Sequence, residues 1–266
     1  MLAARVITGL VLGIAITAAI LFLPTPYAAA TLALMWLAGG WEWAGLGRAR
    51  DGGRWLYVAG LLVLMLLAAF LPPTDGGIDV LVAIAVVAWC VALAGIVTFP
   101  RPIPSWCVLA AGPVALLPSL ILLGFVHATV PLGPKLTLLA LALVWAADIG
   151  AYAVGRLLGR VKLAPKVSPG KTWEGVIGGV AFAALTAWIG SRLLDLPTAA
   201  LIAIGVCTAL VSVVGDLTVS MLKRSVGLKD SGRLLPGHGG VMDRIDGLIA
   251  AVPVYAAGLR LAGLLA

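Results

Sequence analysis

The chain has 266 residues, of which 62% are hydrophobic and only 11% are charged. Soluble domains carry about 25% charged residues, so this composition excludes an ordinary soluble protein. The net charge of +7 is weak support for a nucleic-acid partner, because no soluble domain is expected to present a basic face. No nucleic-acid partner is therefore expected.

The apolar residues fall into nine segments close to the length of a membrane-spanning helix, about 20 residues. They cover roughly residues 6–23, 27–46, 55–71, 78–99, 104–126, 133–152, 175–190, 197–215 and 245–265. The first has a positive start, as signal peptides do, but no small-x-small cleavage site follows it, so we expect it to be retained. Alternating barrel patterning is absent, which leaves helices as the structure that satisfies the backbone in lipid. We predict an all-α, polytopic membrane bundle in one integral domain, residues 1–266.

The basic residues predict the orientation of this bundle. With the N-terminus in the cytoplasm and nine spans, only Lys135, Arg192 and Arg260 of the 18 lysines and arginines fall outside. Cytoplasmic loops carry the excess of basic residues in membrane proteins. We therefore predict a cytoplasmic N-terminus and an outer C-terminus.

The chain divides by polarity into an N-terminal helical part, 1–147, and a catalytic part, 148–266. The first part has few acids, and Glu42 lies late in its second span, within Trp41-Glu42-Trp43. The favoured interpretation of Glu42 is an interfacial carboxylate held by an aromatic belt. A role at the functional site is the alternative.

The second part contains two polar loops that are predicted to face the cytoplasm, 148–175 and 216–246. In the first, Asp148 and Tyr152 are four residues apart and share a helix face. Its segment Ser168-Pro169-Gly170-Lys171-Thr172 is similar to the end of a P-loop, but Pro165 stands where the first glycine would be. A glycine turn with Lys171, running into a helix near Thr172, can still present amides and a cation to phosphate. A positive-inside loop with a helix cap is the equally weighted alternative.

The second loop contains four carboxylates and five cations in a chain that is otherwise hydrophobic. Asp243 and Asp246 are three apart and lie on one face of the last helix, and Asp216 ends the eighth span. Such oxygen ligands suit Mg²⁺, with neighbouring cations holding a polyphosphate. A solvated connector with mutual salt bridges is the alternative. His238, beside glycines, is interpreted as either a structural residue or a phosphate-binding or catalytic one.

These residues resemble the signature of the phosphatidate cytidylyltransferase family, the CDP-diacylglycerol synthases. The second loop matches in Ser220-x-x-Lys223-Arg224, Lys229-Asp230 and His238-Gly239-Gly240-x-x-Asp243-Arg244-x-Asp246. The first loop matches in Asp148, Ala151-Tyr152, Gly155-Arg156, Gly159-Arg160, Ser168-Pro169, Lys171-Thr172 and Glu174-Gly175. The resemblance in motifs covers about residues 148–246. The N-terminal half resembles the family only in its general hydrophobic character.

The resemblance implies that CTP and phosphatidic acid give CDP-diacylglycerol and pyrophosphate with Mg²⁺, at the inner membrane of a bacterium and facing the cytoplasm. The candidate catalytic residues are Asp216, Asp243, Asp246, Lys223 and Arg224. Asp216 and Asp243 are expected to hold the metal, with Asp246 as a ligand or a partner of the ligands. Lys171, Lys223 and Arg224 are expected to hold the CTP phosphates, and Arg156, Arg160 or Lys166 is expected to receive the lipid head group. The other candidate substrate-binding residues are Asp148, Tyr152, Ser168, Thr172, Glu174, Ser220, Lys229, Asp230, His238, Gly239 and Gly240.

Two alternatives stay open from the sequence. One is another CTP-dependent enzyme, a lipid or polyprenol kinase or a cytidylyltransferase with a different lipid. The other is an ion-coupled transporter, whose carboxylates would bind ions near the membrane midplane. A second cation and a homodimer are also left open.

Overall fold

The computed structural model describes residues 2–71, 74–232 and 239–265, and these form nine helices and one short hairpin. The helices are α1 (Leu2–Phe22), α2 (Thr25–Leu46), α3 (Asp51–Phe70), α4 (Asp75–Thr98), α5 (Ser105–Ala128), α6 (Gly133–Leu158), α7 (Trp173–Leu194), α8 (Thr198–Ser225) and α9 (Met242–Leu261). Each corresponds to one of the nine predicted spans. The predicted all-α, polytopic architecture is confirmed.

Two helices are longer than predicted, and this changes the description of the two polar loops. α6 continues to Leu158 and α8 to Ser225, so the polar residues at 148–156 and 216–224 are helical rather than in loops. Their spacing explains the difference, since Ser220 contacts Asp216 and Arg156 contacts Tyr152 one turn away. Such pairs, four residues apart, support a helix beyond its apolar part.

The hairpin was not predicted. β1 (Lys162–Ala164) pairs antiparallel with β2 (Ser168–Thr172), with Lys162 opposite Thr172. Pro165, Pro169 and Gly170 disfavour a helix here. Pairing the two strands instead satisfies part of the backbone of this segment.

Among the described residues, six helices, α3 to α8, are long and apolar enough to cross a membrane by length and composition. α3 and α4 leave most of their apolar side chains on the surface, including Leu62, Phe70 and Val87. A face of this kind would aggregate in water but is suited to lipid. We therefore describe the chain as an integral membrane protein.

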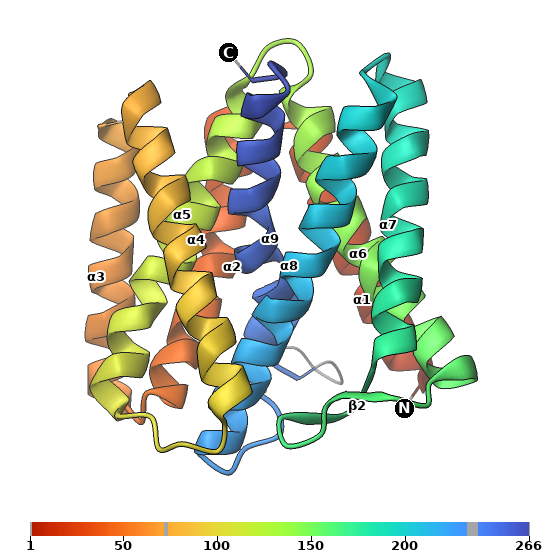
Figure 1. Cartoon of the computed structure of the whole chain (residues 1–266). Helices are drawn as coiled ribbons and strands as arrows, with labels where there is room; N and C mark the ends of the chain where they lie inside the picture. The colour runs from red at the N-terminus through yellow and green to blue at the C-terminus, as the bar shows by residue number, and fades with distance from the viewer. Residues whose placement is uncertain (1, 72–73, 233–238, 266) are drawn as a thin grey trace.

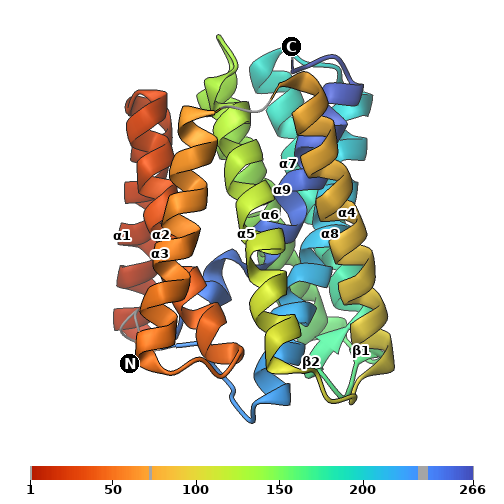
Figure 2. The ribbon, with the colours of Figure 1, turned by 90° about the vertical axis from the view of Figure 1, so that its left-hand side faces the viewer.

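α9 lies at the centre of the bundle, between α5 and α8 (Figure 1). Its residues 249–252 and Tyr255 are fully buried, and the Tyr255 hydroxyl donates a hydrogen bond to the Leu136 carbonyl of α6. Figure 2 shows α1, α2 and α3 on one side of the bundle and α4, α7 and α8 on the other, with α5 between them. α9 is thus the helix through which both parts of the chain are connected.

Small residues bring neighbouring helices into close contact. Gly150 of α6 packs on the backbone of Gly178 in α7, and Gly215 of α8 packs on the backbone of Asp246 in α9. A side chain at Gly215 would overlap the Asp246 carbonyl. Close backbone approach of this type is typical of membrane helices, and here it joins two helices that carry acidic residues.

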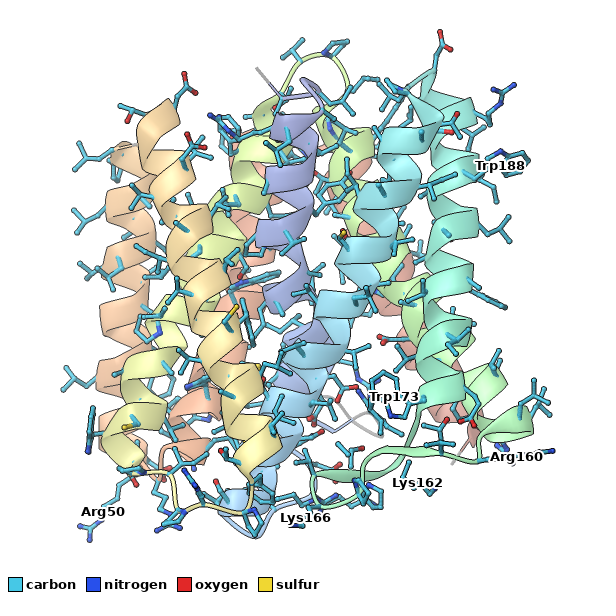
Figure 3. The ribbon with its side chains drawn as sticks, in the orientation of Figure 1. Arg50, Arg160, Lys162, Lys166, Trp173 and Trp188 are labelled. Carbon is cyan, nitrogen blue, oxygen red and sulfur yellow. The ribbon has the colours of Figure 1, made fainter. Side chains whose placement is uncertain are left out.

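The two ends of the chain lie at opposite ends of the bundle, and the hairpin lies at the same end as the N-terminus (Figure 1). The labelled cations Arg50, Arg160, Lys162 and Lys166 gather at this end too (Figure 3). We call it the polar end of the bundle. Its assignment to the cytoplasm remains a prediction.

Candidate active site

The two predicted polar segments meet at the polar end of the bundle. Lys171 of β2 forms an ion pair with Asp216 of α8, with 2.5 Å between Nζ and Oδ2. The Ser220 hydroxyl donates a hydrogen bond of 3.2 Å to the other oxygen of Asp216. Arg224, one turn further along α8, donates to the Val167 carbonyl of the hairpin at 3.4 Å. The hairpin is therefore fastened to the face of α8 that carries Asp216 and Arg224.

Three carboxylates, those of Asp148 in α6, Asp216 in α8 and Asp246 in α9, lie within range of mutual electrostatic repulsion. Lys171 offsets this repulsion at both Asp148 and Asp246, and Arg244 offsets it at Asp148. Asp246 is half-buried, and one of its oxygens accepts the Gly247 amide at 2.8 Å. We call Asp148, Asp216 and Asp246 the acidic cluster. Asp148 was predicted as a substrate-binding residue rather than as a member of the acidic group.

Asp243 has a different environment from the acidic cluster. Lys223 contacts its Oδ1 at 2.6 Å, and the amides of Ser231 and Gly240 donate to its Oδ2 at 3.0 and 3.3 Å. Asp243 precedes the predicted span 245–265. Burial acts to raise its pKa, but the contacts with Lys223 and Ser231 outweigh burial, so the pKa lies below the usual value. Its charge is thus already balanced within the protein.

The acidic cluster has the donor chemistry that a hard divalent cation requires, since carboxylate oxygens are the preferred ligands of Mg²⁺. Within the described part of the chain, however, no three acidic, histidine or cysteine side chains are arranged to hold a metal ion. The Lys171 ammonium lies against Asp216, where a cation would contact this carboxylate. The residues fit Mg²⁺ by chemistry, and binding would require Lys171 to move away.

Several predicted substrate-binding residues of the first segment have structural contacts. The Thr172 hydroxyl is buried and accepts the Gly175 amide at 3.1 Å as the cap of α7. The Glu174 carboxylate accepts the Val161 amide at 3.1 and 3.2 Å, which ties the hairpin to α7. Ser168 begins β2, opposite Ala164. These residues support the turn that presents Lys171, and the Thr172 hydroxyl is committed to the cap rather than facing a ligand.

The remaining predicted cations are exposed on the surface. Arg156 donates a hydrogen bond to the Tyr152 hydroxyl, and both side chains are exposed. Arg160, Lys166 and Lys229 are exposed as well. Arg160 and Lys166 lie at the polar end (Figure 3). We call the exposed cations Arg156, Arg160, Lys166 and Lys229 the basic rim, and their charges suit contacts with phosphate.

The glycine-rich part of the second segment is described only in part. Gly239 has a φ of +81°, which favours glycine, and its α-carbon lies beside Asp243 and exposed Asp230. His238 and Arg233 lie outside the described residues. The hypotheses about His238 therefore stay predictions.

The favoured interpretation of Glu42 is wrong. The residue is 2% exposed, so it is enclosed by the protein and is not held by an aromatic belt at the surface. Its oxygens accept hydrogen bonds from the Val241 and Met242 amides and from the Ser231 hydroxyl. The neighbouring Trp43 is buried and donates to the Val108 carbonyl. A carboxylate inside an apolar helix was the sequence signal, and its partners are about 190 to 200 residues away in sequence, which hid them.

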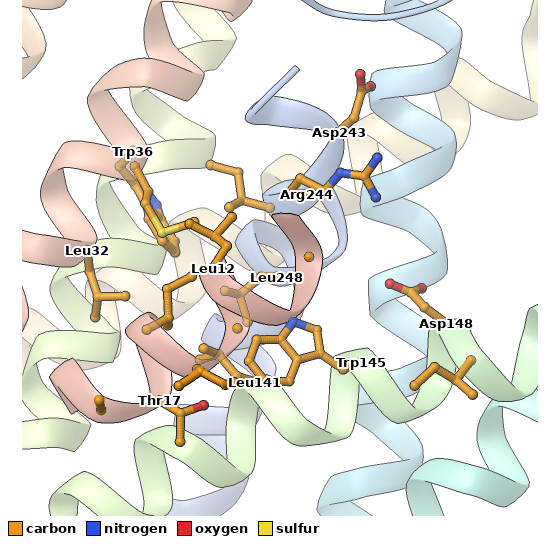
Figure 4. Close-up of a pocket in the computed structure, with 18 of the residues that line it drawn as sticks. Leu12, Thr17, Leu32, Trp36, Leu141, Trp145, Asp148, Asp243, Arg244 and Leu248 are labelled. Atoms are coloured by element: carbon orange, nitrogen blue, oxygen red, sulfur yellow. The ribbon is translucent and has the colours of Figure 1, made fainter. Parts of the chain in front are cut away.

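A cavity of about 830 Å³ extends from this site between α1, α2, α6 and α9. Asp148, Asp243 and Arg244 lie at one side of it, and Leu12, Leu32, Trp36 and Leu141 lie at the other (Figure 4). The cavity is within the size range of small-molecule sites, about 300–1,000 Å³. Its lining is suited to a ligand with one charged and one apolar part.

This structure defines a polytopic helical membrane protein with a charged site that opens into an apolar cavity. Residues 3–262 match the model of the cytidylyltransferase family. The chain is also 42% identical to the phosphatidate cytidylyltransferase of Pseudomonas aeruginosa, over 99% of this chain and 98% of the relative. It is 38% identical to that of Haemophilus influenzae, over 96% and 97%.

The chain therefore belongs to the cytidylyltransferase family, and it is an enzyme of the nucleotidyltransferase class. The match spans nearly the whole chain, whereas the motifs seen in the sequence covered only about 148–246. The N-terminal half is thus part of the family's shared structure, in agreement with its contribution of Glu42 and one wall of the cavity. Family membership also removes the transporter alternative.

Proposed function

We propose that this enzyme transfers the cytidylyl group of CTP to phosphatidic acid, giving CDP-diacylglycerol and pyrophosphate. The observation that carries the proposal is the cavity that joins Asp148, Asp243 and Arg244 to an apolar groove between α1 and α6. A water-soluble phosphate acceptor would not require such a groove. The relatives named phosphatidate cytidylyltransferase support the same substrate.

In the proposed arrangement, the acyl chains of phosphatidic acid lie along the apolar side of the cavity, against Leu12, Trp36 and Leu141. The phosphate head group lies beside Arg244. Arginine binds phosphate well because its planar guanidinium offers several donors. The cations of the basic rim, Arg156, Arg160 and Lys166, would guide the anionic substrates to the site.

The chemical step needs no protein nucleophile. An oxygen of the lipid phosphate attacks the α-phosphorus of CTP, and the bond from this phosphorus to the oxygen bridging to the β-phosphate breaks. Pyrophosphate leaves with that electron pair. Lys171, Lys223 and Arg224 would neutralise the phosphates of CTP, so that catalysis depends on positioning and charge stabilisation.

We also propose that the reaction depends on Mg²⁺. Asp216 and Asp246 would hold the ion, with Asp148 or Asp243 as a further ligand. The ion would supply Lewis-acid stabilisation of charge on the phosphates. Lys171 would then leave Asp216 and turn to the nucleotide. The polar end would face the cytoplasm of a bacterial cell, at its inner membrane, within phospholipid biosynthesis.

The test is an assay of the purified protein in detergent with phosphatidic acid and each of the four nucleoside triphosphates, with and without Mg²⁺. Label in the α-phosphate of CTP should enter the lipid, and label in the γ-phosphate should appear in pyrophosphate. A lipid kinase would give the opposite result, with γ-label in the lipid and CDP released. Transfer to another lipid but not to phosphatidic acid would refute the substrate assignment.

A further inference from the structure

Glu42 is a buried carboxylate on α2 that contacts the start of α9. Its Oε2 accepts hydrogen bonds from the Met242 amide at 2.8 Å and from the Ser231 hydroxyl at 2.7 Å. Its Oε1 accepts the Val241 amide at 3.1 Å. All three partners are donors, which matches an ionised carboxylate, because that group only accepts.

The contact supplies α9 with a cap that its own residues lack. The first amides of a helix have no partner within the helix, and its N-terminus carries a partial positive charge. The residue in the capping position of α9 is Val241, whose side chain cannot accept a hydrogen bond. Glu42, which belongs to α2, acts as the cap instead. Its negative charge also interacts favourably with the partial positive charge at the N-terminus of α9.

The backbone around Glu42 is shaped to fit the carboxylate. A Cβ atom at Gly232 or Gly240 would overlap the Glu42 side chain, and at Gly240 it would also overlap the Ser231 hydroxyl. These glycines therefore allow the segments before and after residues 233–238 to close on the same carboxylate. Burying a charge is costly unless it is hydrogen-bonded or paired, so each of the three donors lowers the cost of burying Glu42.

The atoms that Glu42 holds are next to acidic residues of the site. Asp243 follows Met242 directly, and its own carboxylate accepts the amides of Ser231 and Gly240. Asp246 lies one turn further along α9, in the acidic cluster. A shift at the start of α9 would therefore move Asp243 relative to Lys223 on α8, whereas Asp246 is held separately by its backbone contact with Gly215.

We propose that Glu42 is a positioning residue for the reaction. It fixes the start of α9 and thereby the position of Asp243 relative to the residues of α8. It does so without touching the substrates. The proposal rests on the proposed cytidylyl transfer for its kinetic test, and its structural test is independent of activity.

The experiment compares the wild type with Glu42→Gln. Glutamine keeps the size of the side chain, but its NH₂ group must face at least one of the three donors, whichever way the amide is turned. We expect kcat to fall roughly 10- to 100-fold, since small displacements of reacting groups have effects of this size. KM for CTP and for phosphatidic acid should change by less than about threefold.

Hydrogen exchange, followed by mass spectrometry, gives the independent measurement. In Glu42→Gln the amides of residues 239–246 should exchange faster, while α3 and α4 exchange as in the wild type. The matched control is Asp79→Asn, which removes a carboxylate that contacts Arg260 at the other end of α9. It should leave kcat and the exchange of residues 239–246 unchanged.

Each outcome has a clear meaning. Wild-type kcat and exchange in Glu42→Gln would overturn the proposal, and so would faster exchange spread evenly over all helices, which indicates a general structural role. If Glu42→Gln does not fold, Ser231→Ala removes one donor only and should give the same local change with a kcat reduced about threefold. Wild-type values in Ser231→Ala would then refute the proposal. If the wild type does not transfer cytidylyl to phosphatidic acid, the proposed function fails, and the exchange result alone decides on Glu42.

Discussion

The two ends of α9 are both held by carboxylates from other helices, but the contacts differ in kind. At the N-terminal end, Glu42 of α2 is buried and accepts three hydrogen bonds, and Asp243 of α9 itself pairs with the largely buried Lys223 of α8. At the C-terminal end, Arg260 contacts Asp75 and Asp79, whose side chains are 81% and 66% exposed. Buried charges need complete pairing, whereas exposed ion pairs contribute little. The comparison therefore predicts that function and stability are concentrated at one end of this helix.

The largest effect is expected for Asp246→Asn, in the acidic cluster at the N-terminal end. Asparagine keeps the shape but removes the charge that would help to bind a cation or orient the substrates. Cytidylyl transfer should fall by about 10³-fold, the upper range for the loss of one preorganised electrostatic contact. The measurement is the rate of incorporation of α-labelled CTP into lipid.

The matched variant is Asp195→Asn, which changes an aspartate at the C-cap of α7, away from the polar end. It should keep wild-type activity. Both proteins should elute as a single species in detergent with unchanged thermal midpoints. Near-normal activity of Asp246→Asn would remove Asp246 from the site.

A large loss of stability is expected for Asp243→Asn. This variant leaves Lys223 without its charged partner, and the side chain of Lys223 is only 12% exposed. Removing one member of a buried pair typically costs about 3–5 kcal/mol of folding free energy. Denaturation in mixed detergent micelles should show a reduction of this order, together with loss of activity.

The double variant Asp243→Asn with Lys223→Met separates stability from activity. It removes both charges, so much of the lost stability should return. Cytidylyl transfer should stay low, because both residues are proposed to act in the site. Recovery of activity together with stability would mean that the ion pair has only a structural role.

A moderate and selective effect is expected for Gly13→Phe in the cavity. Gly13 lines the groove, and a Cβ atom added there would meet nothing within 4 Å. The phenyl ring would therefore fill space proposed for acyl chains without disturbing the fold. KM for long-chain phosphatidic acid should rise by about tenfold, with a smaller rise for short-chain lipid and none for CTP.

Gly60→Phe on α3 provides the control, since Gly60 also has open space around it but does not line the cavity. It should leave KM for both substrates unchanged. Equal effects of the two substitutions, or a rise in KM for CTP in Gly13→Phe, would contradict the assignment of the groove to acyl chains.

The smallest effect is expected for Asp79→Asn at the C-terminal end of α9. Exposed ion pairs contribute about 0–1 kcal/mol to stability. The thermal midpoint in detergent should fall by less than about 2 °C, a shift that corresponds to a change below 1 kcal/mol in a domain of this size. A loss of stability as large as that of Asp243→Asn would show that the two ends of α9 are equivalent after all.

The sequence predicted the number of helices and the segments that meet at the site because both depend on local patterns. Apolar segments of membrane-spanning length define the helices, and the charged motifs lie at their ends. The pairing of Lys171 with Asp216 was anticipated only as a meeting of two segments on one side of the membrane. The sequence predicted that the eighth span ends near residue 215, whereas α8 continues to Ser225. The difference arises because the last turns of α8 are polar.

Glu42 shows why part of the site could not be predicted. Its partners, Ser231, Val241 and Met242, are distant in sequence, and two of them contribute only backbone amides. Because almost every residue has a backbone amide, residue type does not reveal which amides will bind a carboxylate. Likewise, Asp243 differs from the acidic cluster because Lys223 pairs with it. The spacing of Asp243 and Asp246 along α9 does not show which of the two has a basic partner.

The contact between α8 and α9 at Gly215 has a consequence for how the protein tolerates different membranes. Because the backbones touch there, the two helices must tilt together when the bilayer becomes thicker or thinner. The spacing of Asp216 and Asp246 should then be almost independent of lipid chain length. At Gly13 of α1, which lines the groove, a Cβ atom would meet nothing within 4 Å, so no close helix contact is made at this position. Bilayer thickness would therefore alter lipid selection before it alters the chemical step.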